Sequence, residues 1–193
     1  MRFFIIIIAL FLSGCAMKTL PPLNLYTINE NIEVPRVSNS PYKNRVLKVS
    51  APLSLSTPLG YKIYFKYKNG DSGAYQNSQW QIPLYKQLQK FFITALSKAN
   101  LFKSVVPIES SVYEDLRLES SVYTLENQIE DNISYAVVDI ELRLIDMKDR
   151  SILKKRRFRY KERAPTFDAK GYINALNSAL EKLANDMVIW LSR

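Results

Sequence analysis

The chain has 193 residues, and its 27 lysines and arginines against 18 aspartates and glutamates give a formal net charge of +9. It contains no histidine and a single cysteine, Cys15. These counts exclude a Ser-His-Asp triad, a histidine general base, a histidine-ligated metal site and any disulfide within one copy of the chain. The length suits one domain that folds without cross-links.

The first residues have the pattern of a secretory signal. Arg2 supplies the positive end, and residues 3–12 form an apolar run that is too short for a permanent transmembrane helix. The run closes with Leu12, Ser13, Gly14 and Cys15, an order that resembles the bacterial lipobox. We therefore predict a lipoprotein signal peptide over residues 1–14 and a covalent lipid on Cys15, with no other cofactor.

The lipobox resemblance also predicts a location. Acyl chains on Cys15 would hold the protein on a membrane, since each buried CH₂ contributes roughly 0.8 kcal/mol. Ala16 follows the cysteine where inner-membrane lipoproteins commonly carry an aspartate, so we expect the outer membrane and a domain facing the periplasm. An ordinary signal peptide with a chance cysteine and an uncleaved anchor remain alternatives.

Residues 15–43 are rich in proline and asparagine, which break helix and strand patterns. We interpret them as a tether that carries the lipidated cysteine. Residues 23–28 alternate in period two and predict an edge strand within this tether. The globular domain is expected over residues 44–193.

The first half of that domain combines short strands with one helix. Residues 61–68 alternate aromatic or apolar side chains with lysines, and Asn69 and Gly70 signal a tight turn, so we predict a hairpin with a return strand over 73–76. The alternation also fits a nucleic-acid stacking platform, but a periplasmic address argues against nucleic acid as a partner. Residues 84–99 have helical spacing after Pro83, and shorter extended segments are expected at 46–51 and 101–107.

The second half is a run of strands closed by a helix. Alternation predicts strands over 116–123, 136–144 and 152–163, with a polar, acidic stretch over 126–132. The last helix begins near Asp168, a good N-cap. Together these elements predict an α/β (α+β) two-layer domain, with a mostly antiparallel sheet and two main helices packed on one face.

A basic run is the sharpest surface feature of the sequence. Strand alternation sends Lys155, Arg157, Arg159 and Lys161 to one face, and Lys154 and Arg156 to the other with Phe158. Such a run is typical of a solvated edge that resists aggregation, and it also fits attraction to anionic headgroups or to an acidic partner.

We take these four bases, together with Trp80, as candidate partner or headgroup contacts. Trp80 and Trp190 each lie near a helix end and fit either the core or an exposed anchor. Asp139 and Glu141 share one strand face and could serve as a glycosidase pair, but the neighbouring Arg143 favours simple ion pairing. We therefore predict no catalytic residues and no metal ligands.

The order of landmarks resembles the ABC-type transport auxiliary lipoprotein family, which includes PqiC-like lipoproteins. The shared landmarks are the lipobox, Leu25 with Tyr26 and Thr27, Trp80 shortly before Pro83 and Leu84, the segment 102–106, and Trp190 with Leu191. The resemblance implies a non-enzymatic outer-membrane lipoprotein. It also implies work with an MCE-domain protein and an ABC permease and ATPase that move phospholipid or other hydrophobic molecules, and it admits ring-shaped homo-oligomers.

Two other functions stay open beside this one. A structural lipoprotein that chaperones an outer-membrane barrel or lipopolysaccharide machinery would have the same size, anchor and fold class. A carboxylate-based envelope hydrolase would depend on Asp139 and Glu141. The partners recovered with the protein separate the first two hypotheses, and mutation of both carboxylates tests the third.

Overall fold

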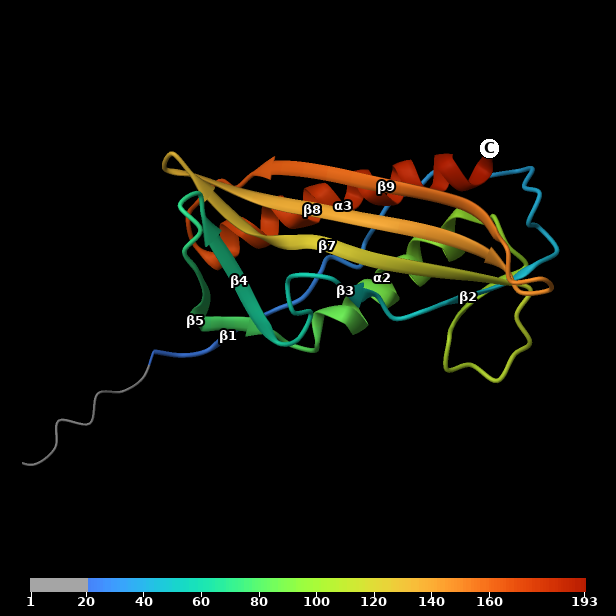
Figure 1. Cartoon of the computed structure of the whole chain (residues 1–193), viewed down its shortest axis with the longest axis horizontal. Helices are drawn as coiled ribbons and strands as arrows, with labels where there is room; N and C mark the ends of the chain where they lie inside the picture. The colour runs from blue at the N-terminus through green and yellow to red at the C-terminus, as the bar shows by residue number, and fades with distance from the viewer. Residues whose placement is uncertain (1–20) are drawn as a thin grey trace, which may run out of the picture.

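Three long antiparallel strands form the backbone of the fold. The computed structural model describes residues 21–193, so the predicted signal peptide and Cys15 lie outside the described residues. Strands β7 (Leu116–Glu130), β8 (Ile133–Asp146) and β9 (Ile152–Arg163) follow one another in a meander (Figure 1). One face of this meander is apolar because its side chains alternate along each strand, and the predicted apolar row of β8 is fully buried: Ala136, Val138, Ile140, Leu142 and Leu144.

Shorter strands complete the sheet around β7. Strands β2 (Val46–Val49), β3 (Leu53–Ser54) and β4 (Lys62–Tyr67) all pair parallel with β7 along its length. Strand β6 (Ser104–Pro107) extends the sheet beyond β2, and β5 (Ser72–Trp80) extends it beyond β4. The sheet is therefore mixed: its long ladders are antiparallel, as predicted, while most of its short ladders are parallel.

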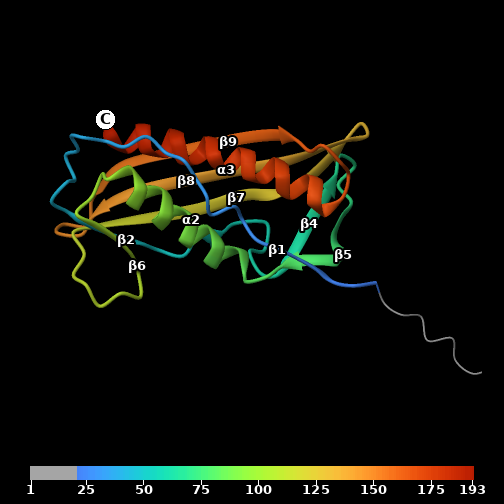
Figure 2. The same ribbon diagram turned by 180° about the vertical axis from the view of Figure 1, so that it is seen from behind.

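Both helices cover the same face of the sheet, which confirms the predicted α+β class. Helix α3 (Ala169–Ser192) lies along β8 and β9, and helix α2 (Leu84–Ala99) lies beside it (Figure 2). Helix α3 begins as predicted, because the side chain of Asp168 accepts a hydrogen bond of 2.8 Å from the backbone N–H of Gly171. Helix α2 follows Pro83 and ends at Asn100, whose φ of 59° is left-handed.

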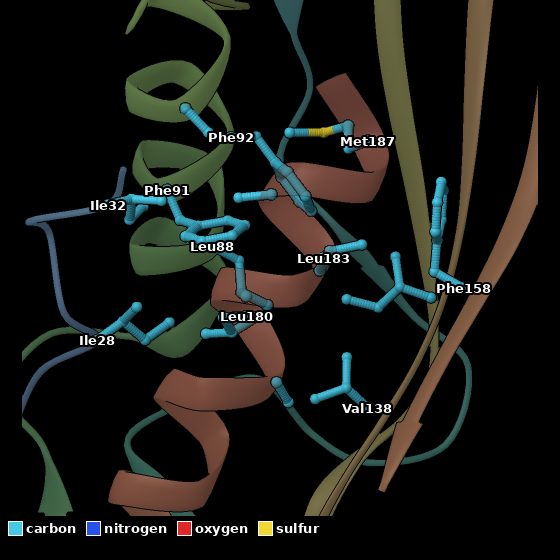
Figure 3. Close-up of a cluster of buried hydrophobic side chains, with 14 of the residues drawn as sticks. Ile28, Ile32, Leu88, Phe91, Phe92, Val138, Phe158, Leu180, Leu183 and Met187 are labelled. Carbon is cyan, nitrogen blue, oxygen red and sulfur yellow. The ribbon is translucent and has the colours of Figure 1, made fainter. Parts of the chain in front are cut away.

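The core fills the space between the helices and the sheet. Figure 3 shows Leu88 and Phe92 of α2 facing Leu183 and Met187 of α3, with Phe158 of β9 on the far side of α3. All of these side chains are buried. Among the described residues, no helix is long and apolar enough to cross a membrane.

The expected tether is the first point at which the fold differs from the sequence-based prediction. Its edge strand exists as β1 (Asn24–Tyr26), which pairs parallel with β5. The residues after β1 do not hang free, because Ile28 and Ile32 are buried against the helices. The backbone N–H of Val37 also donates to the carbonyl of Ala99 at 2.9 Å. The boundary expected at residue 44 is therefore corrected, since the fold already begins at β1.

The acidic stretch expected over residues 126–132 is the second difference. Strand β7 continues to Glu130, and Asn127 is fully buried in it. The Asn127 side chain donates to the Tyr75 hydroxyl at 2.6 Å and accepts from the Ser134 hydroxyl at 2.8 Å, so these bonds satisfy a buried amide. The turn to β8 is made by Asp131 and Asn132, both with positive φ.

The predicted hairpin at Asn69 and Gly70 is confirmed. Strands β4 and β5 pair antiparallel, and Gly70 has a φ of 98°, which favours glycine. Phe65 of β4 packs edge-on against Tyr75 of β5, with ring centroids 5.3 Å apart. This packing supports the sheet-face interpretation of the aromatic row.

Candidate interaction surface

The face of the sheet turned away from the helices carries the candidate contacts of β9. We call the part of it formed by β7, β8 and β9 the outer face. Strand alternation places the bases as predicted: Lys155, Arg157, Arg159 and Lys161 interact with side chains of β7 and β8 on the outer face. Phe158, between them in sequence, is buried on the helix side.

Asp139 of β8 is the centre of the ion pairs on the outer face. Arg157 donates from Nε and Nη2 to the two carboxylate oxygens of Asp139 at 2.6 and 2.7 Å. Arg159 donates from Nε to the same carboxylate at 3.2 Å. Two parallel bonds from one guanidinium fix its orientation, so Arg157 is held against the sheet.

The other two candidate bases are paired as well. Lys155 lies 3.3 Å from a carboxylate oxygen of Glu141, and Lys161 lies 2.5 Å from one of Glu130. All four candidate bases of β9 therefore have an acidic partner on β7 or β8. Four of the seven bases in the run from Lys154 to Arg163 are thus paired with acids in the fold, and Asp139 is shared by two of them.

Two tyrosines of the outer face lie beneath these bases. The guanidinium carbon of Arg157 is 3.6 Å from the ring centroid of Tyr123, and Nζ of Lys161 is 4.5 Å from that of Tyr135. Both distances suit cation–π attraction. The outer face is thus an ordered surface of paired charges and tyrosine rings rather than a free cationic patch.

The carboxylates of the outer face act as ion-pair partners. Partial burial raises the pKa of the Asp139 carboxyl, but the hydrogen bonds and charges of Arg157 and Arg159 outweigh it and hold that pKa below its ordinary value. A glycosidase acid needs the opposite shift. Arg143 lies 3.7 Å from Glu141 and 3.6 Å from Glu119, which supports the ion-pairing interpretation.

The other face of β9 is joined to helix α3. Lys154 donates from Nζ to the carbonyl of Trp190 at 3.1 Å, and the Tyr160 hydroxyl donates to Asp186 at 2.6 Å. The ring of Trp190 packs edge-on against Phe158, with centroids 5.8 Å apart. Trp190 is half-buried and helps to hold the end of α3 on the sheet.

Trp80 is not a surface contact, so this part of the prediction is wrong. Its side chain is 1% exposed and belongs to the core. Trp80 ends β5, and its backbone N–H donates to the carbonyl of Tyr61 at 2.8 Å. An alternating strand buries one of its faces, so a large aromatic side chain at this place fills the core.

An open hollow of about 780 Å³ at one end of the sheet was not predicted from the sequence. It lies between the β6–β7 loop and the β8–β9 turn. Arg45 lines it and donates to a carboxylate oxygen of Asp146 at 3.0 Å and to the carbonyl of Asp115 at 3.1 Å. These partners are far apart in sequence, so no local pattern signals them.

The described residues offer little for metal chemistry. No group of three or more Cys, Asp or Glu side chains within them could hold a metal ion. Several acids are instead held by nearby donors, as Asp146 illustrates: the backbone N–H of Lys148, then the Arg45 guanidinium, lower the pKa of its carboxyl. Cys15, the predicted lipid site, lies outside the residues that the structure describes.

The family profile of the ABC-type transport auxiliary lipoprotein component matches residues 26–188. The chain belongs to this family. The match runs from β1 into the last helix, and a family of lipoproteins implies membrane anchoring. No curated protein matches the chain.

Solved structures share the fold of this family member. A crystal structure of a protein from Xanthomonas campestris is 17% identical, with a TM-score of 0.74, over 86% of this chain and 94% of the other. A second crystal structure, of an uncharacterized protein, is also 17% identical, with a TM-score of 0.63, over 81% of this chain and 98% of the other. At these identities the likeness establishes the fold alone.

Proposed function

We propose that the protein is a non-enzymatic, lipid-anchored auxiliary component of an MCE/ABC-type transport system. In this proposal it is held on the outer membrane through Cys15, faces the periplasm, and helps to move phospholipid or another hydrophobic molecule between envelope membranes. Its partners are an MCE-domain protein and the ABC permease and ATPase.

The family match over residues 26–188 is the observation that carries this proposal. The lipobox order that ends at Cys15 supports the anchor. The lowered pKa of Asp139 supports a role outside acid–base catalysis, because that carboxylate is committed to Arg157 and Arg159.

The outer face is the surface that we assign to the protein partner. Its tyrosines and paired charges resemble the polar and aromatic composition of protein interfaces more than that of a headgroup site. Arg159 is the most suitable residue to substitute, since its side chain is 68% exposed. Asp139 would still be paired with Arg157 after the substitution.

A pull-down of the tagged, lipidated protein from native envelopes in mild detergent tests the proposal. We expect an MCE-domain protein with its permease and ATPase, read by mass spectrometry. Arg159→Glu should weaken this recovery, because it places a negative charge beside Asp139. Lys170→Glu, an equal charge change at an exposed position of α3 on the opposite side of the sheet, is the matched control and should leave recovery unchanged.

The alternatives give different results in the same experiment. Recovery of a β-barrel or lipopolysaccharide assembly protein without an MCE partner would replace transport by assembly as the function. Equal recovery with Arg159→Glu and Lys170→Glu would keep the transport function and remove the outer face as its contact surface.

A further inference from the structure

Exposed apolar side chains gather where the chain enters the fold. They come from the residues around β1, from the start of β4 and from the start of α2. We call this group the apolar edge, and it consists of Leu23, Leu25, Tyr61, Ile82 and Tyr85. Leu25 and Tyr61 are 54% and 52% exposed, which is high for apolar side chains on a rigid scaffold.

Backbone hydrogen bonds hold the three segments of the apolar edge together. The N–H of Gln81 donates to the carbonyl of Tyr26, and the N–H of Trp80 donates to that of Tyr61, each at 2.8 Å. The N–H of Tyr85 donates to the carbonyl of Leu59 at 3.0 Å. The three segments are therefore fixed relative to one another rather than being loose loops, and exposed apolar side chains grouped along one edge of a fold mark an interaction site.

The charges next to the two tyrosines of the apolar edge are positive. Lys62 follows Tyr61 and Lys86 follows Tyr85, and both lysines are exposed. Neither forms an ion pair with another described residue. Tyrosine next to lysine is typical of side chains at a membrane surface, where the ring lies at headgroup depth and the ammonium meets anionic phosphate.

The length of the chain before β1 places this edge near a membrane. Leu23 is the eighth residue after Cys15, and a chain of this length spans at most about 28 Å when fully extended. Strand β1 and the start of α2 lie along one long side of the molecule, whereas α3 and β9 lie along the opposite side (Figures 1 and 2). A lipid on Cys15 would therefore keep the first of these sides close to the bilayer.

We propose that the apolar edge rests on the membrane that holds the Cys15 lipid, with Tyr61, Ile82 and Tyr85 at headgroup depth and Lys62 and Lys86 on anionic phosphates. This orientation rests on the lipid anchor of the proposed function. In this orientation the outer face stands at the side of the molecule, away from the membrane plane, and α3 faces the periplasm. The apolar edge could instead bind a second copy of the chain, but such an interface would not explain why a lysine follows each of the two tyrosines.

Fluorescence quenching on the full, lipidated chain in vesicles tests this orientation. Because acylation consumes Cys15, Tyr61→Cys and Tyr85→Cys each introduce a single free thiol for an environment-sensitive dye. Ile189→Cys is the matched control, since Ile189 is exposed and belongs to α3, the helix that lies along the opposite long side. The vesicles contain anionic phosphatidylglycerol and a lipid with a quencher at headgroup depth.

We expect at least twofold quenching of the dye at positions 61 and 85, and little at 189. Equal quenching at all three positions, or none at 61 and 85 in protein that still floats with the vesicles, would overturn the proposal. Dye at 61 or 85 that is shielded from water but not quenched by lipid would assign the edge to a second copy. Protein that fails to float contradicts the lipid anchor instead.

Discussion

Arg157 binds the carboxylate diagonal to it rather than the one directly opposite. In the ladder between β8 and β9 its direct partner is Glu141, but its guanidinium bonds both oxygens of Asp139, which lies opposite Arg159. Diagonal neighbours on a sheet lie within reach of long side chains. Because Arg157 binds Asp139, Glu141 is free to pair with Lys155 and Arg143. Each of these two carboxylates therefore serves two bases.

Replacing Asp139 tests how much this arrangement stabilises the fold. Asp139→Asn should lower the free energy of unfolding by about 1–2 kcal/mol at neutral pH, between the values for exposed and buried pairs. Because the folded-state pKa of Asp139 lies below its unfolded value, the stabilisation is complete above that unfolded value of about 4 and is lost as the pH falls through the folded-state pKa. Urea unfolding of the unsubstituted protein and of Asp139→Asn between pH 7 and pH 3 measures this stabilisation. A difference in unfolding free energy that does not change with pH would contradict the prediction.

Trp80 should act on stability because it is buried. Trp80→Ala should lower the free energy of unfolding by about 3–5 kcal/mol, since it removes a large core side chain and leaves a cavity. Trp190→Ala, at a half-buried ring, is expected to cost less. Thermal and urea unfolding compare the two, and an equal or larger loss for Trp190→Ala would contradict the packing described here.

A glycine pair tests the start of α3. A Cβ at Gly171 would meet the backbone of Thr166, so Gly171→Ala should cost about 1–3 kcal/mol through overpacking. Gly60→Ala is the control, because a Cβ there meets nothing within 4 Å. Its effect should be within about 0.5 kcal/mol, as for most open surface positions. Similar unfolding midpoints for the two variants would show that the turn before α3 adapts freely.

Cys15 is tested by membrane fractionation. Cys15→Ala should release the domain from membranes or leave it as an uncleaved precursor, because no thiol remains for lipid transfer. Immunoblotting of soluble and membrane fractions reads both location and size. A membrane-bound product of normal size would show that Cys15 is not the anchor.

Local patterns in the sequence predicted most of the regular elements. The period of two in β8 and the helical spacing of α2 and α3 identified their buried faces, and Asp168 marked the start of α3. Each of these signals lies within one element. They could be recognised without knowing which segments meet.

The features that were missed depend on contacts between distant segments. Asn127 belongs to the stretch described from the sequence as polar and acidic, and only the contacts with Tyr75 and Ser134 show why its amide can be buried in a strand. Ile28 looks like part of a tether until the helices cover it. The basic run likewise predicted a charged surface. Its acidic partners lie on β7 and β8, and the sequence of β9 alone gives no sign of them. The predicted lipidation of Cys15 and the transport partners remain untested predictions.

The pairing of β2, β3 and β4 with β7 has a consequence for biogenesis. The proposed function places the protein in the periplasm. For a chain exported there with its N-terminal part first, these three strands would reach the periplasm before the strand that they pair with. They must stay unpaired until about residue 130 has followed, and their open edges are then prone to association with other chains. The β7–β9 meander, whose contacts are local, is the part that forms readily once exported. Periplasmic chaperones are therefore expected to hold the N-terminal half of this protein, and a truncation that ends before β7 should yield no stable fragment.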